Sequence, residues 1–309
     1  MNKYFKLSVF VKGYCMGIAD IIPGISGGTI ALILGIYNHL LQSLSRFDTT
    51  LLKMIKNKQF KNAFEYIDLL FLINVFTGIL TAIISMSHLV HYLMSNFPIY
   101  TWSFFFGLIL SSVFYLLDKL ESIKISSLIA VLLGCVVGYF VATLTPVDTP
   151  NSFIFIVATG FIAITAMILP GISGSFLLLI LGKYAYITAA IKNLGSAQSI
   201  EIVIAFIIGA ILSLLSFSKL LSFLLEKFPN FVMSVLIGFI LGSVQKVWPW
   251  RSIENSIIIR GKEKILSESL YFPDQLNTEV ILALTFMLIG FSLVITLLLF
   301  QKRGVSSAG

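Results

Sequence analysis

The sequence predicts an all-α integral membrane protein built as an inverted-topology repeat. The chain has 309 residues, of which 58% are hydrophobic and 11% charged, and its mean hydropathy is +0.99. A soluble domain of this length could not cover so much apolar surface with polar residues. Apolar runs close to the roughly 20 residues needed to cross a bilayer recur along the chain, and two of its motifs occur twice. Lipid-exposed segments should be helices, because an open sheet cannot satisfy its backbone hydrogen bonds there.

Two matched pairs of segments indicate an internal duplication. Ile22–Tyr37 and Leu169–Tyr184 are identical at ten of sixteen positions, and both contain PGISG. Ser85–Val113 and Ser216–Val244 are identical at twelve of twenty-nine positions, with a Phe-Pro pair in register. Because both matches occur in the same order, the sequence predicts two membrane repeats. The predicted repeats are residues 1–150 and 151–309.

Each predicted repeat begins with an apolar block that PGISG interrupts and continues with three transmembrane helices. The broken blocks are 8–44 and 153–191, and the helices are expected at 69–90, 100–117, 126–144, 202–225, 231–247 and 280–300. Each arm of a block has about 15 residues, or about 22 Å of helix, which is shorter than a full span. Re-entrant hairpins with PGISG at the tip give three crossings per repeat, whereas spanning arms give five. Both numbers are odd, so either alternative inverts the second repeat.

The distribution of charge predicts the orientation of the chain. Most of its 21 lysines and arginines fall on the side of the N-terminus, whereas the turns 91–99 and 145–152 have neither residue. The positive-inside rule then places both termini in the cytoplasm. The exception is the loop 246–278, which contains Lys246 and Arg251. It is either a solvated loop or a collar that captures anionic headgroups. The net charge of +7 therefore reflects topology and anionic lipid, and we expect no nucleic-acid partner.

Two further patterns concern packing and the membrane surface. Residues 46–68 have mixed charge and helical periodicity, and we expect an amphipathic cytoplasmic segment there. Gly78 and Gly209 occupy matched positions in apolar helices, as do Gly107 and Gly238. Small residues of this kind predict close helix packing.

The duplicated PGISG motif predicts an anion site. The proline ends the incoming helix, the glycines permit positive φ and close approach of a ligand, and the serine can cap the outgoing helix. Each helix N-terminus then presents free N–H groups, which suits a phosphate or carboxylate. The alternative is a pair of breaks that only allow close packing, but the duplication favours a ligand site. The assigned residues are Pro23, Gly24, Ser26, Gly27 and Gly28, with Pro170, Gly171, Ser173, Gly174 and Ser175.

Asp20 and Lys183 are the charged candidates beside the two motifs. Asp20 is embedded in apolar sequence, and its counterpart in the second repeat is Met167. An intramembrane carboxylate is functional by default, so Asp20 is the candidate for proton coupling; it could instead hold the loop, repel the wrong anion or act as a local cap. Lys183 is either a snorkelling lysine or a residue that helps collect headgroups. The sequence shows no paired carboxylates and no metal-ligand spacing, so we predict neither an enzyme nor a cofactor or metal.

The segments GIADIIPGISGGTIALILGIY (Gly17–Tyr37) and ILPGISGSFLLLILGKY (Ile168–Tyr184) resemble the bacterial polyprenyl-phosphate transporters. This resemblance covers nearly the whole chain. It implies that undecaprenyl phosphate, left in the outer leaflet after envelope-polymer assembly, is returned to the inner leaflet of the bacterial cytoplasmic membrane. It also implies that Thr29 belongs to the site. The two motifs should not be equivalent, because Ser175 and Phe176 stand where the first motif has Gly28 and Thr29.

The expected mechanism follows from the charge of this substrate. A single charge at the bilayer centre costs at least a few kcal/mol, whereas the polyprenyl tail is already in lipid. Basic residues outside would collect the phosphate, the paired tips would hold it, and the inverted halves would rock. Inward movement of an anion opposes an inside-negative potential, which favours coupling to the proton gradient. One alternative is a transporter or channel for a small soluble anion. The other is an intramembrane lipid phosphatase or transferase, but the sequence lacks the converging nucleophile or metal, acids and bases that such an enzyme needs. The sequence does not predict the oligomeric state.

Overall fold

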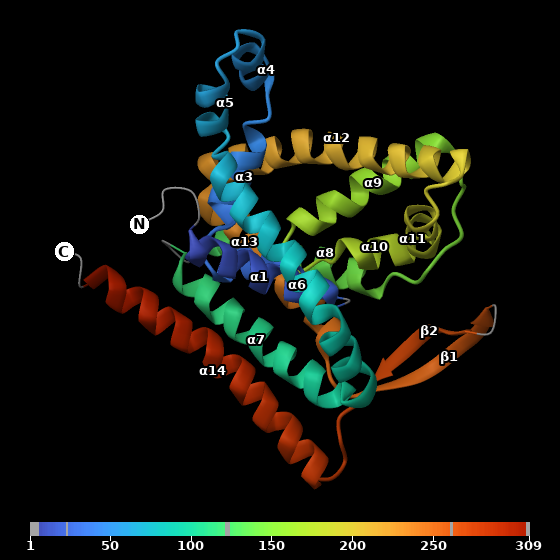
Figure 1. Cartoon of the computed structure of the whole chain (residues 1–309). Helices are drawn as coiled ribbons and strands as arrows, with labels where there is room; N and C mark the ends of the chain where they lie inside the picture. Colours follow the sequence, from blue (N-terminus) through green and yellow to red (C-terminus); the bar gives the residue numbers. More distant parts are fainter. Residues whose placement is uncertain (1–5, 23, 121–123, 260–261, 307–309) are drawn as a thin grey trace. The chain divides into compact units, whose positions relative to one another are not determined.

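The computed structural model describes residues 6–22, 24–120, 124–259 and 262–306, and this part of the chain is mainly helical (Figure 1). The chain forms two compact units, one made of residues 1–87 and 146–232 and the other of residues 88–145 and 233–309. Each unit takes segments from both predicted repeats. The compact units and the sequence repeats are therefore different divisions of the same chain.

Six helices of the described residues are long and apolar enough to cross a membrane. They are α6 (Leu69–Asn96), α7 (Pro98–Asp118), α8 (Ile125–Thr143), α12 (Ala197–Lys227), α13 (Pro229–Ser243) with its 3-10 extension η1 (Val244–Val247), and α14 (Thr278–Ser306). All six predicted transmembrane segments are thus confirmed as helices. Several run past their predicted ends, because a continuing helix keeps its backbone hydrogen-bonded at the edge of the lipid. The predicted turn 91–99 shrinks to the single residue Phe97.

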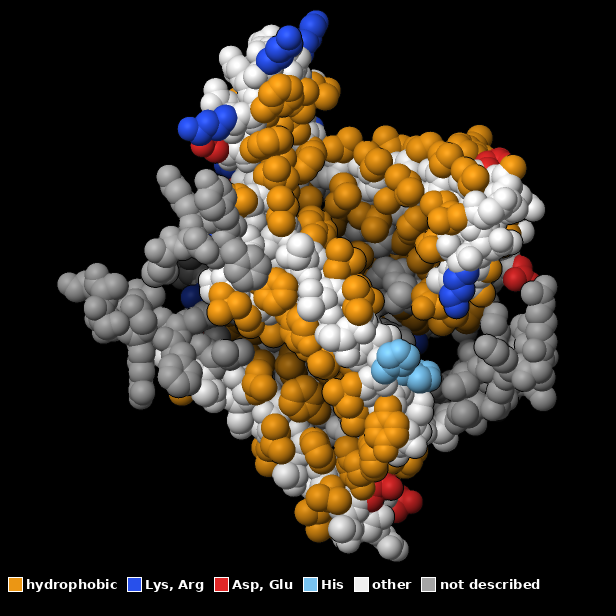
Figure 2. All heavy atoms as spheres, viewed as in Figure 1, with side chains coloured by type: hydrophobic (Ala, Val, Ile, Leu, Met, Phe, Trp, Pro, Cys, Tyr) orange, Lys and Arg blue, Asp and Glu red, His pale blue; other side chains and the backbone are white. Residues whose placement is uncertain are grey.

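The outer sides of these helices are apolar. Figure 2 shows hydrophobic side chains along the exposed surface of α12, where Ile204, Ile211 and Leu220 are each about half exposed. In water such a surface would be costly, but contact with lipid acyl chains removes that cost. The exposed apolar surface therefore agrees with a membrane protein.

Each predicted broken block contains three helices, not two. The first consists of α1 (Leu7–Ile21), α2 (Gly27–Ile33) and α3 (Tyr37–Ser45), and the second of α9 (Phe153–Ile168), α10 (Gly174–Ile180) and α11 (Tyr184–Lys192). The additional break falls at Gly35 and Gly182, whose φ angles are 69° and 65°. Glycine adopts this left-handed conformation without strain and so ends the short helix. The expectation of one outgoing arm of about 15 residues is wrong, and α10 meets α11 at 107°.

Glycines let the helices of the first unit cross closely. A methyl group on Gly78 of α6 would overlap the carbonyl oxygen of Phe10 in α1. In the same way, a methyl group on Gly209 of α12 would overlap the carbonyl oxygen of Val157 in α9. The predicted packing role of this matched pair is confirmed. The helices α1 and α6 therefore meet as α9 and α12 do.

Two short helices, α4 (Thr49–Lys56) and α5 (Phe60–Tyr66), form a hairpin between α3 and α6. Its inner side is a small core of Leu51, Ala63 and Ile67. The prediction of an amphipathic helical segment at residues 46–68 is confirmed, and the segment proves to be two helices.

In the second unit, α7 packs against α14 and α8 against α13, again at glycines. A methyl group on Gly107 would overlap the Met287 carbonyl oxygen of α14, and one on Gly238 would overlap the Val131 carbonyl oxygen of α8. These two glycines also occupy matched positions, so their predicted packing role is confirmed. A core of Trp250, Val280 and Ala283 lies at one end of this unit.

The predicted loop 246–278 contains a β-hairpin that the sequence analysis missed. Strands β1 (Arg251–Ile259) and β2 (Lys262–Leu270) pair antiparallel, with Arg251 opposite Leu270 and Ile259 opposite Lys262. The isoleucine-rich run of β1 favours a strand, but the basic residues along 246–278 led to the prediction of a solvated loop or a headgroup-capturing collar.

Candidate functional site

The first PGISG turn joins α1 to α2, and side chains of the same hairpin bind its backbone N–H groups. The Asp20 carboxylate Oδ1 accepts the Gly27 N–H at 2.7 Å. The Ser26 hydroxyl accepts the Gly28 N–H at 3.1 Å, which confirms the predicted cap. Gly24 has a φ of 88° and reverses the chain. Pro23, which the sequence assigns to this site, lies outside the described residues.

The second turn joins α9 to α10 and has the same backbone shape but different hydrogen bonds. Gly171, after the buried Pro170, has a φ of 85°. The Ser173 hydroxyl does not cap α10 and lies instead 2.9 Å from the Ser175 hydroxyl. The predicted cap is wrong here, because Ser175 offers a partner where the first motif has a glycine. Among the described residues, no side chain accepts the N–H of Gly174 or Ser175.

The two turns touch each other. The Gly171 N–H donates to the Thr29 hydroxyl oxygen at 2.9 Å, and the Ser26 hydroxyl donates to the Leu169 carbonyl oxygen at 3.3 Å. A Cβ added to Gly28 would lie 3.0 Å from the Ile168 carbonyl oxygen, so the absence of a side chain at Gly28 lets the two turns come this close. Ser26 and Thr29 are each 2% exposed. The first unit thus brings together the two motifs that the sequence assigns to one site.

Tyr37 is a member of this contact that the sequence analysis did not single out. Its hydroxyl, on a side chain that is 3% exposed, donates to the Ile168 carbonyl oxygen at 3.1 Å. The available signal was the tyrosine that ends both matched segments. However, the matched Tyr184 is 46% exposed, so the shared residue does not imply a shared role.

Asp20 and its counterpart Met167 make the two turns chemically different. Both residues lie seven positions before the first glycine of the outgoing helix, Gly27 or Gly174. The second oxygen of Asp20, Oδ2, is buried without a hydrogen-bond partner in the described part of the chain. The Asp20 carboxylate therefore takes the Gly27 N–H that a ligand could otherwise bind, whereas Met167 has no acceptor for the matching N–H of the second turn.

The arrangement can bind an anion at one turn more readily than at two. A bound oxyanion needs N–H or hydroxyl donors that have no other acceptor. In the first turn, the N–H groups of Gly27 and Gly28 already donate to the side chains of Asp20 and Ser26. The second leaves the N–H groups of Gly174 and Ser175 without such an acceptor, beside two hydroxyl groups.

The Lys183 side chain reaches the turn 145–152, which the sequence places outside. The residue is 3% exposed, and its ammonium donates to the Thr149 carbonyl oxygen at 2.6 Å and to the Asn151 side-chain oxygen at 2.5 Å. It also lies over the rings of Phe155 and Tyr186. Polar partners and aromatic rings thus satisfy its charge within the protein, and its part in snorkelling or in headgroup capture stays a prediction.

The other two headgroup candidates, Lys246 and Arg251, lie in the second unit. The Arg251 guanidinium stacks 4.5 Å from the ring centre of Trp102 and donates to the carbonyl oxygens of Trp248, at 2.7 Å, and Lys246. It thereby joins the end of η1 to the start of β1. Both basic side chains are half-buried.

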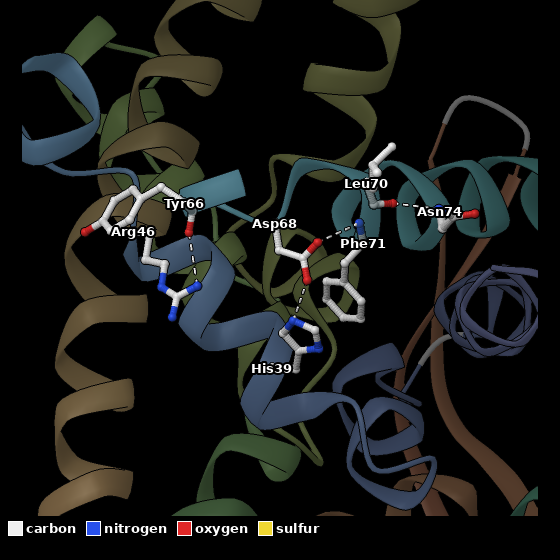
Figure 3. Close-up of polar contacts among 7 residues, drawn as sticks. All are labelled: His39, Arg46, Tyr66, Asp68, Leu70, Phe71 and Asn74. Atoms are coloured by element: carbon white, nitrogen blue, oxygen red, sulfur yellow. Dashed lines mark hydrogen bonds and ion pairs between the residues drawn. The ribbon is translucent and has the colours of Figure 1, made fainter. Parts of the chain in front are cut away.

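A polar cluster joins the two ends of α3 to the end of α5 and the start of α6 (Figure 3). His39 Nε2 lies 2.9 Å from Asp68 Oδ2, and the imidazole stacks on Phe71 with 3.9 Å between ring centres. Arg46 donates to the Tyr66 carbonyl oxygen at 3.0 Å. These contacts tie the α4–α5 hairpin to the helices on both sides of it.

Comparison with known proteins identifies relatives along most of the chain. Residues 16–264 match a family described as undecaprenyl phosphate translocase-like. A polyprenyl-phosphate transporter of Vibrio cholerae is 40% identical over 298 residues, which cover 94% of this chain and 96% of the relative. A Staphylococcus aureus protein of the same name is 34% identical over 260 residues, or 79% of this chain and 87% of the relative. No solved structure matches the chain.

Proposed function

The chain belongs to the undecaprenyl phosphate translocase-like family, and we propose that it returns undecaprenyl phosphate from the outer to the inner leaflet of the bacterial cytoplasmic membrane. Both relatives are named as polyprenyl-phosphate transporters, which indicates lipid-phosphate transport and not catalysis. The observation that carries the finer proposal is the buried contact between the two PGISG turns. This contact brings polar backbone groups of both turns together among apolar helices.

The headgroup binds at the second turn, through the N–H groups of Gly174 and Ser175 and the hydroxyls of Ser173 and Ser175. The two N–H groups lack a side-chain acceptor among the described residues, and the two hydroxyls, which bond to each other, can supply one further donor. The helix that follows has only seven residues, so its dipole is small and direct hydrogen bonds supply the attraction. The first turn, with Pro23, Gly24, Ser26, Gly27, Gly28 and Thr29, supports the second and completes the cradle.

Transport uses two repeats of opposite orientation, with both termini in the cytoplasm. The matched crossings of α1 with α6 and of α9 with α12 support a structural repeat. The outgoing arms consist of helices of seven and nine residues, each about 10 to 14 Å long. Such arms suit re-entrant hairpins that leave the membrane on the side they entered.

Asp20 couples the transport step to protons. Its Oδ1 accepts the Gly27 N–H, while its buried Oδ2 has no partner among the described groups and is available to take up a proton. Protonation would remove a negative charge beside the turns just when an anionic headgroup arrives. Two anions close together in lipid repel each other strongly, which gives this coupling its driving force.

Capture of the headgroup precedes this step. Lys246 and Arg251 lie next to the β-hairpin in the part of the chain that the sequence places outside, and they attract the phosphate from the outer leaflet. We assign Lys183 a supporting role at the second hairpin, since its ammonium is already bound.

The proposal can be tested in liposomes that contain the purified chain and polyprenyl phosphate. A phosphatase added outside removes phosphate only from lipid in the outer leaflet, so protection from it reports translocation. With an acidic exterior imposed and the phosphatase added after increasing delays, we expect the chain to raise the protected fraction, and the double variant Ser173→Ala/Ser175→Ala to slow this about tenfold or more, since each lost hydrogen bond to a charged group is worth about 1.5 kcal/mol or more.

Two outcomes would contradict the proposal. Equal protection with and without the chain would exclude lipid translocation. Uptake of inorganic phosphate into the liposomes, without protection of the lipid, would identify a transporter for a small soluble anion instead.

A further inference from the structure

The α4–α5 hairpin has an apolar surface that its own core does not use. Its inner side is filled by Leu51, Ala63 and Ile67. Outside this core, four large apolar side chains remain between 42% and 65% exposed. We call them the outer stripe: Leu52, Ile55, Phe60 and Phe64. Figure 2 shows hydrophobic side chains gathered on α4 and α5 beside lysines.

Helical spacing places the outer stripe on continuous faces. Leu52 and Ile55 are three residues apart on α4, and Phe60 and Phe64 are four apart on α5, so each pair shares one side of its helix. A hairpin in water would carry polar residues there. The apolar face of each helix is therefore wider than the opposite helix covers.

Four lysines at the hairpin are exposed and have no acidic partner among the described residues. We call them the tip lysines: Lys53, Lys56, Lys58 and Lys61. Lys58 sits at the hairpin bend with a φ of 56°, a conformation that glycine or asparagine adopts at lower cost. The bend therefore carries a positive charge despite local strain.

Two of the neighbouring acidic side chains are already engaged by other groups. Asp48 accepts the N–H groups of Thr50 and Leu51 and the Tyr66 hydroxyl. Burial acts to raise the pKa of Asp48, but these hydrogen bonds hold it below its ordinary value, so the carboxylate stays charged. Asp68 pairs with His39. Glu65 is the one acid on the two helices themselves, and it is exposed.

The chain fixes the hairpin at the edge of the membrane. Only Ile67 and Asp68 separate the end of α5 from the start of α6, which is long and apolar enough to span the bilayer. Leu70 and Ile73, in the first turns of α6, are already 43% and 47% exposed, as lipid-facing residues are. The outer stripe thus lies within a few residues of the acyl chains.

We propose that the α4–α5 hairpin docks onto the leaflet at the N-terminal end of α6, with its outer stripe at the acyl boundary and its tip lysines on anionic lipid headgroups. Amphipathic helices with basic residues beside an apolar face bind membranes in this way. Charge complementarity and continuity with a spanning helix favour a lipid surface over a protein partner. The inference concerns the bilayer surface and holds whatever lipid the chain transports.

The test places a spin label on the outer stripe of the full chain in liposomes. The label is attached at Phe64→Cys in a Cys15→Ala/Cys135→Ala background, and at Asn62→Cys on the other side of α5 as the matched control. Collisions with oxygen and with a water-soluble nickel chelate distinguish lipid from water. We expect the label at position 64 to enter lipid when phosphatidylglycerol is added to phosphatidylcholine, while the label at position 62 stays in water.

Neutralising the tip lysines to glutamine should reduce the ratio of docked to undocked label about fivefold per lysine. The double variant Lys124→Gln/Lys192→Gln, which removes exposed charges elsewhere, should leave that ratio unchanged. Lys58→Gly removes one tip lysine and also relieves the strained φ. It should therefore weaken docking without lowering the unfolding temperature, which separates loss of charge from misfolding.

Two results would overturn the inference. One is a label at position 64 that stays in water in both lipid mixtures. The other is a label that is shielded at high protein-to-lipid ratio regardless of lipid charge, which would show that a second copy of the chain covers the stripe.

Discussion

The two PGISG turns have nearly the same sequence and the same backbone shape, yet they use their N–H groups differently. In the first, Asp20 and Ser26 bind the N–H groups of Gly27 and Gly28. In the second, the matched N–H groups have no side-chain acceptor in the described part of the chain. The two copies of the motif therefore share the fold of the turn but not its hydrogen bonds. A repeated motif predicts a repeated shape, whereas the residues around it decide whether both copies can bind a ligand.

Met167→Asp makes the second turn resemble the first and should have the largest effect. A carboxylate at this position would accept the Gly174 N–H and repel a phosphate, so we expect translocation to fall about 100-fold, the equivalent of one strong charged hydrogen bond. The phosphatase-protection assay measures this loss. Met167→Asn can also accept the Gly174 N–H but carries no charge, so it separates donor occupation from repulsion and should lose less activity; full activity of both variants would refute open donors at the second turn.

Asp20→Asn tests the other side of the comparison. The amide oxygen can still accept the Gly27 N–H, but the side chain no longer exchanges a proton. With one coupled proton, a gradient of one pH unit drives accumulation about tenfold, and we expect this stimulation to vanish in the variant. The test compares translocation with and without an imposed pH gradient. If the gradient still stimulates the variant, Asp20 does not couple transport to protons.

Thr29→Val tests the link between the two turns. Valine has the shape of threonine but cannot accept the Gly171 N–H, and a buried N–H left without a partner costs about 1 to 3 kcal/mol. Thermal unfolding in detergent should show this loss of stability. Thr29→Ser keeps the hydroxyl, so its unfolding temperature should be close to that of the unchanged chain. If the valine and serine variants unfold at the same temperature, the hydrogen bond contributes nothing to stability.

Ser26→Ala should have the smallest of these effects. It removes the cap of α2, which lowers the free energy of unfolding by about 1 kcal/mol. Ser173→Ala is the matched variant in the second turn, where the serine caps nothing, and should cost less. The same denaturation series measures both, and a larger loss at Ser173 would reverse our assignment of the two serines.

Much of the fold could be predicted from the sequence, because lipid imposes simple rules on long apolar segments. The six spanning helices and the helix breaks at PGISG follow from hydropathy and from proline and glycine chemistry. The second break, at Gly35 and Gly182, could not be foreseen. A single glycine within an apolar run is compatible with a continuous helix, and only the packing around it decides. The β-hairpin was missed because its charges resemble those of a solvated loop.

The candidate site was predictable in its location but not in its internal bonding. The duplicated motif pointed to the two turns, and the sequence already showed that Met167 stands in place of Asp20. It could not show which N–H groups the Asp20 carboxylate binds, nor that Tyr37 reaches the opposite hairpin. The contacts of Lys183 could not be predicted for a related reason. Its partners, Thr149 and Asn151, are more than thirty residues away and become visible only after folding.

The two glycine breaks give the hairpins unequal freedom to bend. At Gly182 the segment before α9 lies across the elbow. The Val147 N–H donates to the Ile180 carbonyl oxygen at 2.8 Å, and the Thr149 hydroxyl donates to the Leu181 carbonyl oxygen at 2.5 Å. At Gly35, no described atom would lie within 4 Å of an added Cβ. We therefore expect the second elbow to bend less than the first, whose own tie is the Tyr37 hydroxyl on the Ile168 carbonyl oxygen, so that a substrate held at the second turn would sit on the more rigid of the two hairpins.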